Sequence, residues 1–400
     1  MTDRLYYNDT YLTEFDAVVI ECAEKNGGYH VRLDRSAFYP TSGGQPYDTG
    51  TIADAAVTDV YVDDAGEVWH VLDKVLEPGT YVHGRIDWER RFDHMQQHAG
   101  EHMLANAAYR LLGGGTIGLH LGADISTIDM TLPEGRTRIS DDELRSLEDD
   151  VNRLIQKNVP IKQWFPDAEE LSVLPLRKAP TVNEHVRIVQ IGDLEFCACG
   201  GTHPSSAGQI GLVKIVDARP SRGKLRLAFV CGWRAFELLR KNYDIAHQTA
   251  DMLSTSVDKV PGIVKSMDED VKRLNRELSQ CRSELLRFKA NSFAERAAVN
   301  SAGVKVIAEI VEADVNSARE LATHLSASPR TVAVIGVNTD NNYSYIVCRA
   351  PDVDMACGAC LSAAAKRCGG KGGGRPDFAQ GGGPCEMLAH IAAECAESAK

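Results

Sequence analysis

The stretch HMQQHAGEHML, residues 94–104, carries the three histidines His94, His98 and His102. Because each follows the previous one by four residues, a helix would place all three imidazole rings on one face. The inner segment HAGEH matches the HxxEH pattern of inverted zinc peptidases. The stretch alone leaves three interpretations open: a peptidase helix, a different zinc site, or histidines on a solvated helix surface.

The sequence before this stretch indicates β-structure. Segments such as YHVRLD (29–34) and DVYVDD (59–64) alternate apolar and polar residues, as half-buried strands do. Between them lies the turn-rich segment FYPTSGGQPYDTG (38–50). We therefore expect a β-barrel-like N-terminal subdomain over residues 1–90.

The sequence after residue 90 changes to a mixed pattern. The histidine stretch continues with helical spacing until the glycines at 113–115, which are typical of a helix end. A second amphipathic helix is predicted at 141–157, and the strand RLAFVCG (226–232) closes the region. Residues 91–232 are therefore predicted to form an α+β domain.

Residues 233–300 show a sustained heptad pattern. Apolar residues recur in steps of four and three with charged residues between them, as in a coiled coil. Residues 233–258 are also helical in character, so we predict a helical hairpin or coiled coil. Its seam would close either within the chain or between two chains of a homodimer. The seam residues are Val260, Val264, Met267, Val271, Leu274, Leu278, Cys281, Leu285 and Phe288.

Residues 301–400 are predicted to form a small α/β domain. TVAVIGV and SYIVCRA are typical of strands, whereas ACGACLSAAAKRC and PCEMLAHIAAECAES have helical character. The glycine-rich segment GGKGGGRPDFAQGGG lies between the two helices. Three cysteines of the first helix, Cys357, Cys360 and Cys368, are interpreted as packed thiols rather than a second metal site.

The composition limits the class of protein. The 400 residues carry a net charge of -12 and 11 cysteines. No apolar run approaches the length of about 20 residues that spans a membrane, and the first residues lack the apolar segment of a secretory signal. We therefore expect a cytoplasmic protein whose cysteines are thiols or metal ligands. The negative charge disfavours general nucleic-acid binding unless a local basic patch overrides it.

A second ligand pair for zinc lies far downstream of the histidine stretch. In CACGGTH (197–203), Cys199 and His203 are separated by three residues that include two glycines, which permit a tight turn around one ion. This spacing favours Cys199 over Cys197, which is interpreted as a small buried thiol. The histidine pair remains open between His94 with His98 and His98 with His102. A shell closed by four protein ligands is typically structural.

DHMQQHAGEHML, FYPTSGGQPYDTG and CGGTH together resemble the editing domain of alanyl-tRNA synthetase, and more closely its free-standing relatives, the AlaX proteins. The heptad segment and the glycine-rich segment extend the resemblance, which is therefore to the long AlaX type over nearly the whole chain. It implies a Zn²⁺ site with four ligands. Glu101 departs from the relatives, which often carry Gln or Thr there. The implied ligands are His98, His102, Cys199 and His203.

The resemblance implies hydrolysis of tRNA(Ala) mischarged with serine or glycine. A synthetase site for alanine does not exclude smaller glycine and discriminates poorly against serine, so a second site is needed for translation fidelity. That site requires a polar partner for the serine hydroxyl, which would stay unpaired with alanine. Thr41, Ser42 and Gln45 offer such groups, and Thr41 or Gln45 is preferred. Glu101 or His94 would assist the attacking water as a base.

The glycine-rich tail is predicted to contact tRNA. Exposed glycine backbone allows phosphates to approach, and nearby cations neutralise them. The predicted tRNA-binding residues are Lys366, Arg367, Lys371 and Arg375. No aminoacylation core is recognised, so we expect no tRNA charging.

Two alternatives remain beside this zinc-dependent aminoacyl-tRNA deacylase. One is a non-catalytic tRNA-binding protein whose closed zinc shell is structural. The other is an inverzincin-type metallopeptidase, which requires Glu101 for activity, whereas editing would tolerate Gln at this position.

Overall fold

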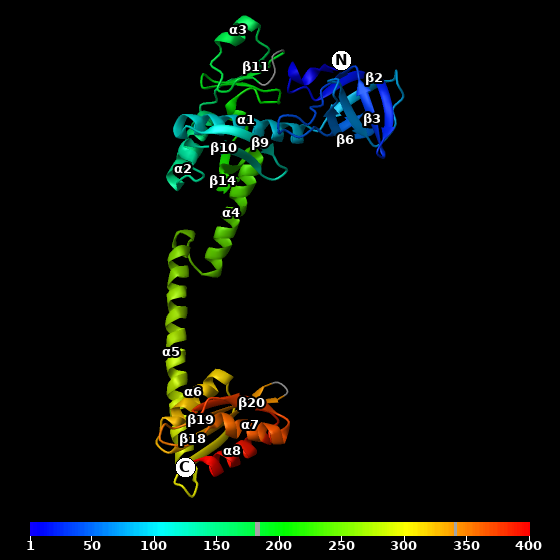
Figure 1. Ribbon diagram of the computed structural model, residues 1–400. Helices are drawn as coiled ribbons and strands as arrows, with labels where there is room; N and C mark the ends of the chain where they lie inside the picture. Colours follow the sequence, from blue (N-terminus) through cyan, green and yellow to red (C-terminus); the bar gives the residue numbers. More distant parts are fainter. Residues whose placement is uncertain (181–184, 340–341) are drawn as a thin grey trace. The chain divides into compact units, whose positions relative to one another are not determined.

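The computed structural model describes residues 1–180, 185–339 and 342–400. The chain divides into two compact units, Met1–Thr249 and Ala250–Lys400, which Figure 1 colours from blue to green and from green to red. Both contain helices and sheets, so the predicted α+β class is confirmed. No helix in the described ranges combines the length and apolar character needed to cross a membrane.

A closed barrel forms the start of the first unit, with strands in the order β2-β3-β7-β6-β5-β8 (Figure 1). Side chains alternate along these strands, and the inward ones, such as Val31, Leu33 and Val60, are fully buried. The predicted barrel is therefore present, while its boundary at residue 90 stays a prediction. The strands are β2 (Glu14–Lys25), β3 (Gly28–Leu33), β5 (Gly50–Ile52), β6 (Ala55–Val62), β7 (Val68–Leu72) and β8 (Tyr81–Ile86).

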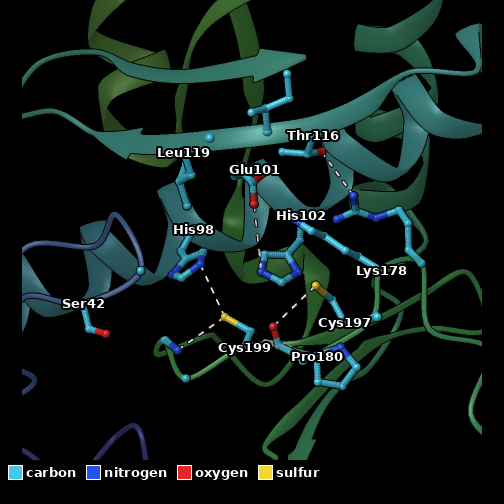
Figure 2. Close-up of a pocket in the computed structure, with 18 of the residues that line it drawn as sticks. Ser42, His98, Glu101, His102, Thr116, Leu119, Lys178, Pro180, Cys197 and Cys199 are labelled. Atoms are coloured by element: carbon cyan, nitrogen blue, oxygen red, sulfur yellow. Dashed lines mark hydrogen bonds and ion pairs between the residues drawn. The ribbon is translucent and has the colours of Figure 1, made fainter. Parts of the chain in front are cut away.

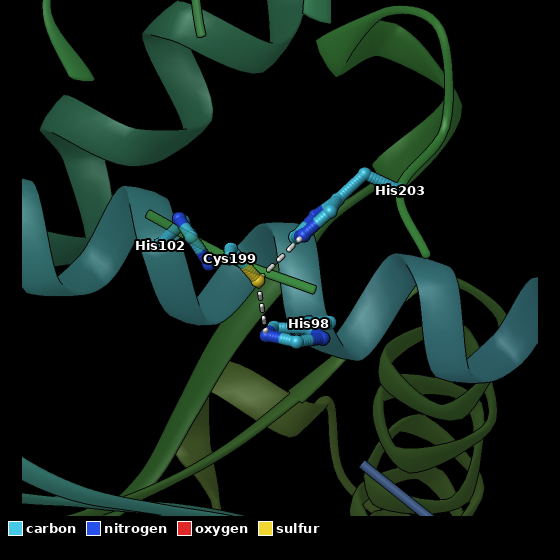
Figure 3. A group of neighbouring side chains, drawn as sticks. All are labelled: His98, His102, Cys199 and His203. Carbon is cyan, nitrogen blue, oxygen red and sulfur yellow. Dashed lines mark hydrogen bonds between the residues drawn. The ribbon is translucent and has the colours of Figure 1, made fainter. Parts of the chain in front are cut away.

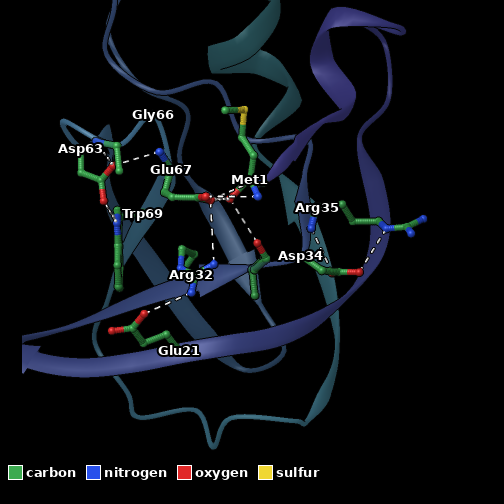
Figure 4. Close-up of polar contacts among 12 residues, drawn as sticks. Met1, Glu21, Arg32, Asp34, Arg35, Asp63, Gly66, Glu67 and Trp69 are labelled. Atoms are coloured by element: carbon green, nitrogen blue, oxygen red, sulfur yellow. Dashed lines mark hydrogen bonds and ion pairs between the residues drawn. The ribbon is translucent and has the colours of Figure 1, made fainter.

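A polar network fastens the first residues to the barrel (Figure 4). One Glu67 oxygen accepts hydrogen bonds from the backbone N–H and the hydroxyl of Thr2, at 2.8 and 2.9 Å. Nearby, β1 (Asp3–Arg4) pairs in parallel with β4 (Arg35–Ser36). The Trp69 indole N–H donates to Asp63 at 2.8 Å across the turn between β6 and β7.

The long helix α1 (Trp88–Leu112) follows the barrel directly. Asp87 caps its first turn by accepting from the Arg90 N–H at 3.2 Å, and Gly113 ends it with a φ of 66°. Arg91 and Asp48, both fully buried, form an ion pair that joins α1 to the barrel. The Arg91 guanidinium also donates to the carbonyls of Thr10 and Ala37, at 3.0 and 2.6 Å, so the buried charge is fully compensated.

Several of the later elements of the first unit pack on α1, among them α2, β9, β10, β13 and β15. A sheet in the order β14-β15-β10-β9 covers α1, and α2 begins with a capping box between Ser140 and Glu143. A smaller sheet in the order β11-β12-β13 carries the CACGGTH segment at its end. The elements are β9 (Gly115–Leu121), β10 (Ser126–Thr131), α2 (Asp141–Gln156), β11 (Ile161–Trp164), α3 (Ala168–Val173), β12 (Ile188–Ile191), β13 (Glu195–Ala198), β14 (Val213–Ser221), β15 (Lys224–Cys231) and α4 (Gly232–Met252).

The second unit is built on a mixed sheet in the order β16-β17-β18-β19-β21-β20. The glycine-rich segment lies in this sheet, because it forms β20 and β21, which pair antiparallel. The elements are α5 (Val260–Glu295), β16 (Ala298–Val299), β17 (Lys305–Val311), α6 (Val315–Ser326), β18 (Thr331–Thr339), β19 (Asn342–Arg349), α7 (Cys357–Cys368), β20 (Lys371–Gly374), β21 (Phe378–Gly383) and α8 (Met387–Ser398).

Helix α5 carries the heptad seam. Near its end, Leu286 and Ala290 are buried in a core that includes α6 and β18. From Val264 to Leu278 the apolar seam side chains are between 50% and 56% exposed. The helical character predicted for this segment is thus present, while the coiled-coil pairing and the four-part division of the chain stay predictions.

Candidate metal centre

Four of the predicted ligands come together in the first unit. His98 and His102 lie one turn apart on α1, and Cys199 and His203 lie on the loop after β13 (Figure 3). One ligand atom from each lies within 4.8 Å of the others. The Cys199 Sγ is 3.5 Å from Nε2 of His98 and 3.4 Å from Nε2 of His203. These separations match the roughly 3.5 Å edge of a tetrahedral zinc site with one sulfur and nitrogen ligands.

The loop between Cys199 and His203 depends on a close approach at Gly201. A Cβ there would lie 2.2 Å from Cε1 of His98, so only glycine fits this position. The Gly201 N–H donates to the Cys199 Sγ at 3.3 Å. The Arg187 guanidinium donates to the carbonyls of Gly201 and Cys199, at 2.7 and 3.3 Å, and thereby fixes the turn.

Gln45 orients the ring of His98. Its Oε1 accepts from the Thr202 backbone N–H at 3.2 Å and lies 2.8 Å from Nδ1 of His98. Because Oε1 can only accept, Nδ1 carries the ring proton and Nε2 offers its lone pair beside the sulfur. Such partners fix the tautomer of a metal-binding histidine.

His102 has a carboxylate on the side of its Nδ1. That nitrogen is 3.9 Å from Glu195, whose carboxylate accepts from Asn106 at 2.8 Å and from Arg177 at 3.0 Å. His102, Glu195 and Cys197 also form a second group with ligand atoms within 4.8 Å. Because Glu195 is already neutralised by Arg177, it is poorly suited to binding a cation. Its distance of 3.9 Å is too long for a hydrogen bond, and Nδ1 of His102 has no hydrogen-bond partner among the described residues.

The electrostatics of the four residues fit a divalent metal. Burial lowers the pKa of His102 to about 3 and those of His98 and His203 well below their usual value, so the rings are neutral ligands. Burial raises the pKa of Cys199 to about 11, against the opposing effects of the Gly201 N–H and Arg187. A bound cation would stabilise the thiolate in this position. Three neutral imidazoles and one thiolate are a zinc-type donor set.

A cavity of about 340 Å³ opens beside this group (Figure 2). Glu101 lies in its wall with His98 and His102, and its carboxylate is 4.0 Å from Nε2 of His102. Burial raises the pKa of Glu101 to about 7, although Arg177 opposes the shift. A carboxyl group with this pKa exchanges a proton readily near neutral pH. The wall also includes Tyr39, Ser42, Gly43, Thr116, Ile117, Gly118, Leu119, Arg177, Lys178, Ala179, Pro180, Cys197, Ala198 and Gly200.

The residues predicted to contact the serine hydroxyl occupy different environments. Gln45 is fully buried behind His98, and its Nε2 donates to the Thr202 hydroxyl at 2.8 Å. Thr41 is exposed and its hydroxyl accepts from the Tyr47 N–H at 3.2 Å. Of the TSGGQ side chains, Ser42 lines the cavity. His94, one turn before His98, lines a different cavity.

Sequence reasoning missed several residues of this cavity. Thr116 and Arg177 are hydrogen-bonded to one another at 3.1 Å across the wall. Neither lies in a recognisable motif, so no signal in the sequence marked them. Cys197 was recognised only as a packed thiol, yet it lines the cavity and burial raises its pKa to about 12.

Family comparisons match most of this architecture. Residues 3–90 match the family "tRNA synthetases class II (A)", and residues 186–227, which include the CGGTH loop, match "Threonyl and Alanyl tRNA synthetase second additional domain". Residues 303–399 match the "DHHA1 domain". Alanine–tRNA ligase of Natronomonas pharaonis is 33% identical over 399 residues, and that of Pyrococcus furiosus is 34% identical over 397 residues. The chain is an AlaX-like relative of alanyl-tRNA synthetase.

The relationship covers nearly all of this chain but less than half of its relatives. The two ligases align with 96% and 95% of the chain, which spans 42% of the length of each. Among solved structures, the C-Ala domain of Aquifex aeolicus alanyl-tRNA synthetase matches 25% of the chain and 93% of its own length, with 20% identity and a TM-score of 0.23.

The predicted tRNA-binding cations lie in the part that matches the DHHA1 domain. Lys366 and Arg367 are in the last turn of α7, Lys371 begins β20, and Arg375 follows that strand. All four are exposed. Arg367 pairs with Glu394 at 2.8 Å and Arg375 with Asp377 at 3.2 Å. Cys357 and Cys360 are buried in the core that α7 and α8 share with the sheet, and Cys368 is partly buried against it. Their interpretation as packed thiols stays a prediction.

Proposed function

We propose that the protein is a zinc-dependent hydrolase that removes serine or glycine from mischarged tRNA(Ala). The observation that carries this proposal is the convergence of three histidines and one cysteine beside a cavity whose wall holds a carboxyl group with a pKa near 7. The relationship to alanyl-tRNA ligases supports the choice of an aminoacyl-tRNA ester as substrate. A tRNA substrate also agrees with the expected cytoplasmic location.

His98, His102, Cys199 and His203 would hold the zinc ion. When bound, zinc would supply Lewis-acid polarisation beside the ester. The carboxylate of Glu101 takes a proton from water, whose oxygen attacks the ester carbonyl carbon. The same carboxyl group returns the proton to the ribose oxygen as the ester bond breaks, which releases the free amino acid and uncharged tRNA. Glu101 is preferred to His94 as the base because Glu101 lines this cavity.

Selection of serine over alanine requires a polar partner that alanine cannot satisfy. We assign this contact to Ser42 and keep Thr41, its neighbour in the TSGGQ loop, as the alternative. Gln45 acts on the reaction through His98, which it orients. The cations Lys366, Arg367, Lys371 and Arg375 would contact tRNA phosphates. A homodimer would close the exposed seam of α5.

Deacylation of Ser-tRNA(Ala), Gly-tRNA(Ala) and Ala-tRNA(Ala) by the purified protein tests the activity. We expect hydrolysis of the seryl or glycyl ester and sparing of the alanyl ester. Cys199→Ala should lose both bound zinc and activity, whereas the matched variant Cys197→Ala should retain zinc. Full activity of a zinc-free Cys199→Ala protein would exclude the metal role.

The same assay separates the two alternative functions. A non-catalytic tRNA-binding protein would bind zinc and tRNA without hydrolysing any of the three esters. A peptidase would cleave a casein or peptide-library substrate. Because Glu101, which lines the cavity, is now assigned the base role in both hydrolases, this proposal replaces the expectation that editing would tolerate Gln at this position. The substrate, rather than the effect of Glu101→Gln, distinguishes the two hydrolases.

A further inference from the structure

A second cavity, of about 680 Å³, lies at the start of α1 in the first unit. His94 and Arg90 line it from α1, and Trp233 and Arg234 line it from the first turn of α4. Ala123, which follows β9, also lines it, together with Glu89, Phe92, Asp93 and Gln96 of α1. The proposed hydrolytic centre uses none of these residues.

His94 is buried in this wall without a partner for one ring nitrogen. The side chain belongs to a residue that is only 3% exposed, and its Nδ1 has no hydrogen bond within the described part of the chain. Burial, together with the neighbouring Arg90 and Arg234, lowers the pKa of His94 to about 3, so the ring is neutral. A neutral imidazole offers one donor and one acceptor, and a buried polar atom of this kind is costly unless a ligand or water satisfies it.

An exposed aromatic face stands beside this polar edge. Trp233 is 64% exposed, and its indole N–H donates to Glu237 at 3.1 Å, which holds the ring on the surface. Phe92 adds a second aromatic side chain to the wall. Proteins that bind unpaired RNA bases stack them on aromatic side chains such as tryptophan, and Trp233 offers such a surface beside polar groups.

The charges of the cavity favour an uncharged ring over a phosphate group. Arg234 is neutralised by Asp93, to which its Nε donates at 2.8 Å. Arg90 donates through Nε to the Tyr47 carbonyl at 3.0 Å, and its terminal nitrogens have no hydrogen bond within the described residues. With Glu89 also in the wall, acidic and basic side chains balance. The guanidinium of Arg90 is thus a directional donor in a cavity without net charge.

We propose that this cavity binds one unpaired nucleobase of an RNA strand, stacked on Trp233, with its edge hydrogen-bonded to His94 and Arg90. The choice of RNA rests on the proposed function, whereas the nucleobase chemistry rests on the cavity alone. The two cavities share their framework. His94 and His98 are one turn apart on α1, and β9 contributes Thr116 to Leu119 to the first cavity and leads to Ala123 in the second.

Two substitutions in the full chain test the stacking. Trp233→Ala should weaken binding of single-stranded RNA hexamers roughly tenfold, whereas Trp233→Phe should retain most of the affinity. Trp164→Ala is the matched control, because the Trp164 indole also donates to a glutamate, Glu170, at 2.9 Å, and lies outside this cavity. Equal affinities for the wild type, Trp233→Ala and Trp164→Ala, measured by fluorescence anisotropy, would overturn the proposal.

A second set of ligands tests whether the base belongs to an RNA strand and whether the cavity distinguishes one base from another. The set consists of four homopolymer hexamers, the four nucleoside monophosphates and a blunt RNA duplex. We expect the hexamers to bind best and to differ in affinity, and His94→Leu to remove that difference without lowering the melting temperature. Tighter binding of a monophosphate than of any hexamer would overturn the assignment to an RNA strand. Equal binding of the duplex would overturn the unpaired base.

Kinetics separate failure of this site from failure of the proposed function. If the protein deacylates tRNA, Trp233→Ala should raise KM with unchanged kcat and zinc content. An unchanged KM for Trp233→Ala, alongside normal deacylation by the wild type, would overturn the cavity's role and leave the function intact. If the wild type does not deacylate, the hexamer measurements still decide whether the cavity binds a base.

Discussion

The proposed metal ligands and the proposed tRNA-binding cations are held in opposite ways. His98 and Cys199 are each fixed by a second residue, Gln45 in one case and Gly201 in the other. Lys366 and Lys371 are exposed and form no ion pair in the described part of the chain. A buried group with fixed partners loses much when one partner is removed, whereas exposed charges act additively and weakly. The two regions should therefore respond very differently to single substitutions.

The largest expected effect on activity comes from a substitution of Glu101, which lies beside the proposed metal ligands. Glu101→Gln should lower kcat for deacylation by about 10²- to 10⁴-fold, because a general base of pKa near 7 is lost. For the zinc-loaded wild type, kcat should rise with pH and level off below pH 7, since the carboxylate is the active form and a cation beside His102 would lower its pKa. The pH profile of kcat for Glu101→Gln should lack this rise with pH. An unchanged profile would assign the base to another group.

Gly201→Ala should disturb the ligand geometry next most strongly. The added methyl group would lie 2.2 Å from Cε1 of His98, so the imidazole ring must move. A shift of about 1 Å in a group that positions the reaction lowers the rate roughly 100-fold. Gly200→Ala is the matched control, because a Cβ there meets only the Tyr7 hydroxyl at 3.4 Å. Zinc content and deacylation rate should fall for Gly201→Ala alone. Equal losses for both variants would mean that the loop, not the contact with His98, is sensitive.

Gln45→Leu should weaken zinc binding by about 10- to 100-fold without removing a ligand. The leucine cannot accept the proton of His98 Nδ1, so the tautomer that presents Nε2 is no longer fixed. Competition with a chelator measures the affinity. Thr41→Val, in the same loop, removes an exposed hydroxyl and should leave the zinc affinity unchanged. A normal zinc affinity for Gln45→Leu would show that the hydrogen bond from Gln45 to His98 does not contribute to zinc binding.

The difference between these residues also explains what the sequence could predict. The i, i+4 spacing of the histidines at 94–102 and the CxxxH spacing of Cys199 and His203 are local, so both candidate groups could be recognised in one stretch each. The spacing did not choose between His94 and His102 as the partner of His98; that choice came from the family resemblance. The role of Gln45 depends on contacts 53 and 157 residues away, with His98 and Thr202, and no local pattern encodes them. The two glycine-rich strands β20 and β21 were likewise hidden, because glycine has low strand propensity and their pairing is set by β19.

The smallest effect of a single substitution is expected at the proposed tRNA-binding cations. Lys371→Ala should weaken tRNA binding severalfold and reduce the slope of log affinity against log salt by about 1, because one phosphate contact is lost. Arg375→Ala should change the slope less, since Arg375 already pairs with Asp377 at 3.2 Å. Filter binding across a salt series measures both. If the two variants change the slope equally, the ion pair between Arg375 and Asp377 does not compete with RNA. If neither variant changes the slope, these exposed cations lie outside the tRNA interface. The cations and the metal ligands would then differ in function as well as in burial.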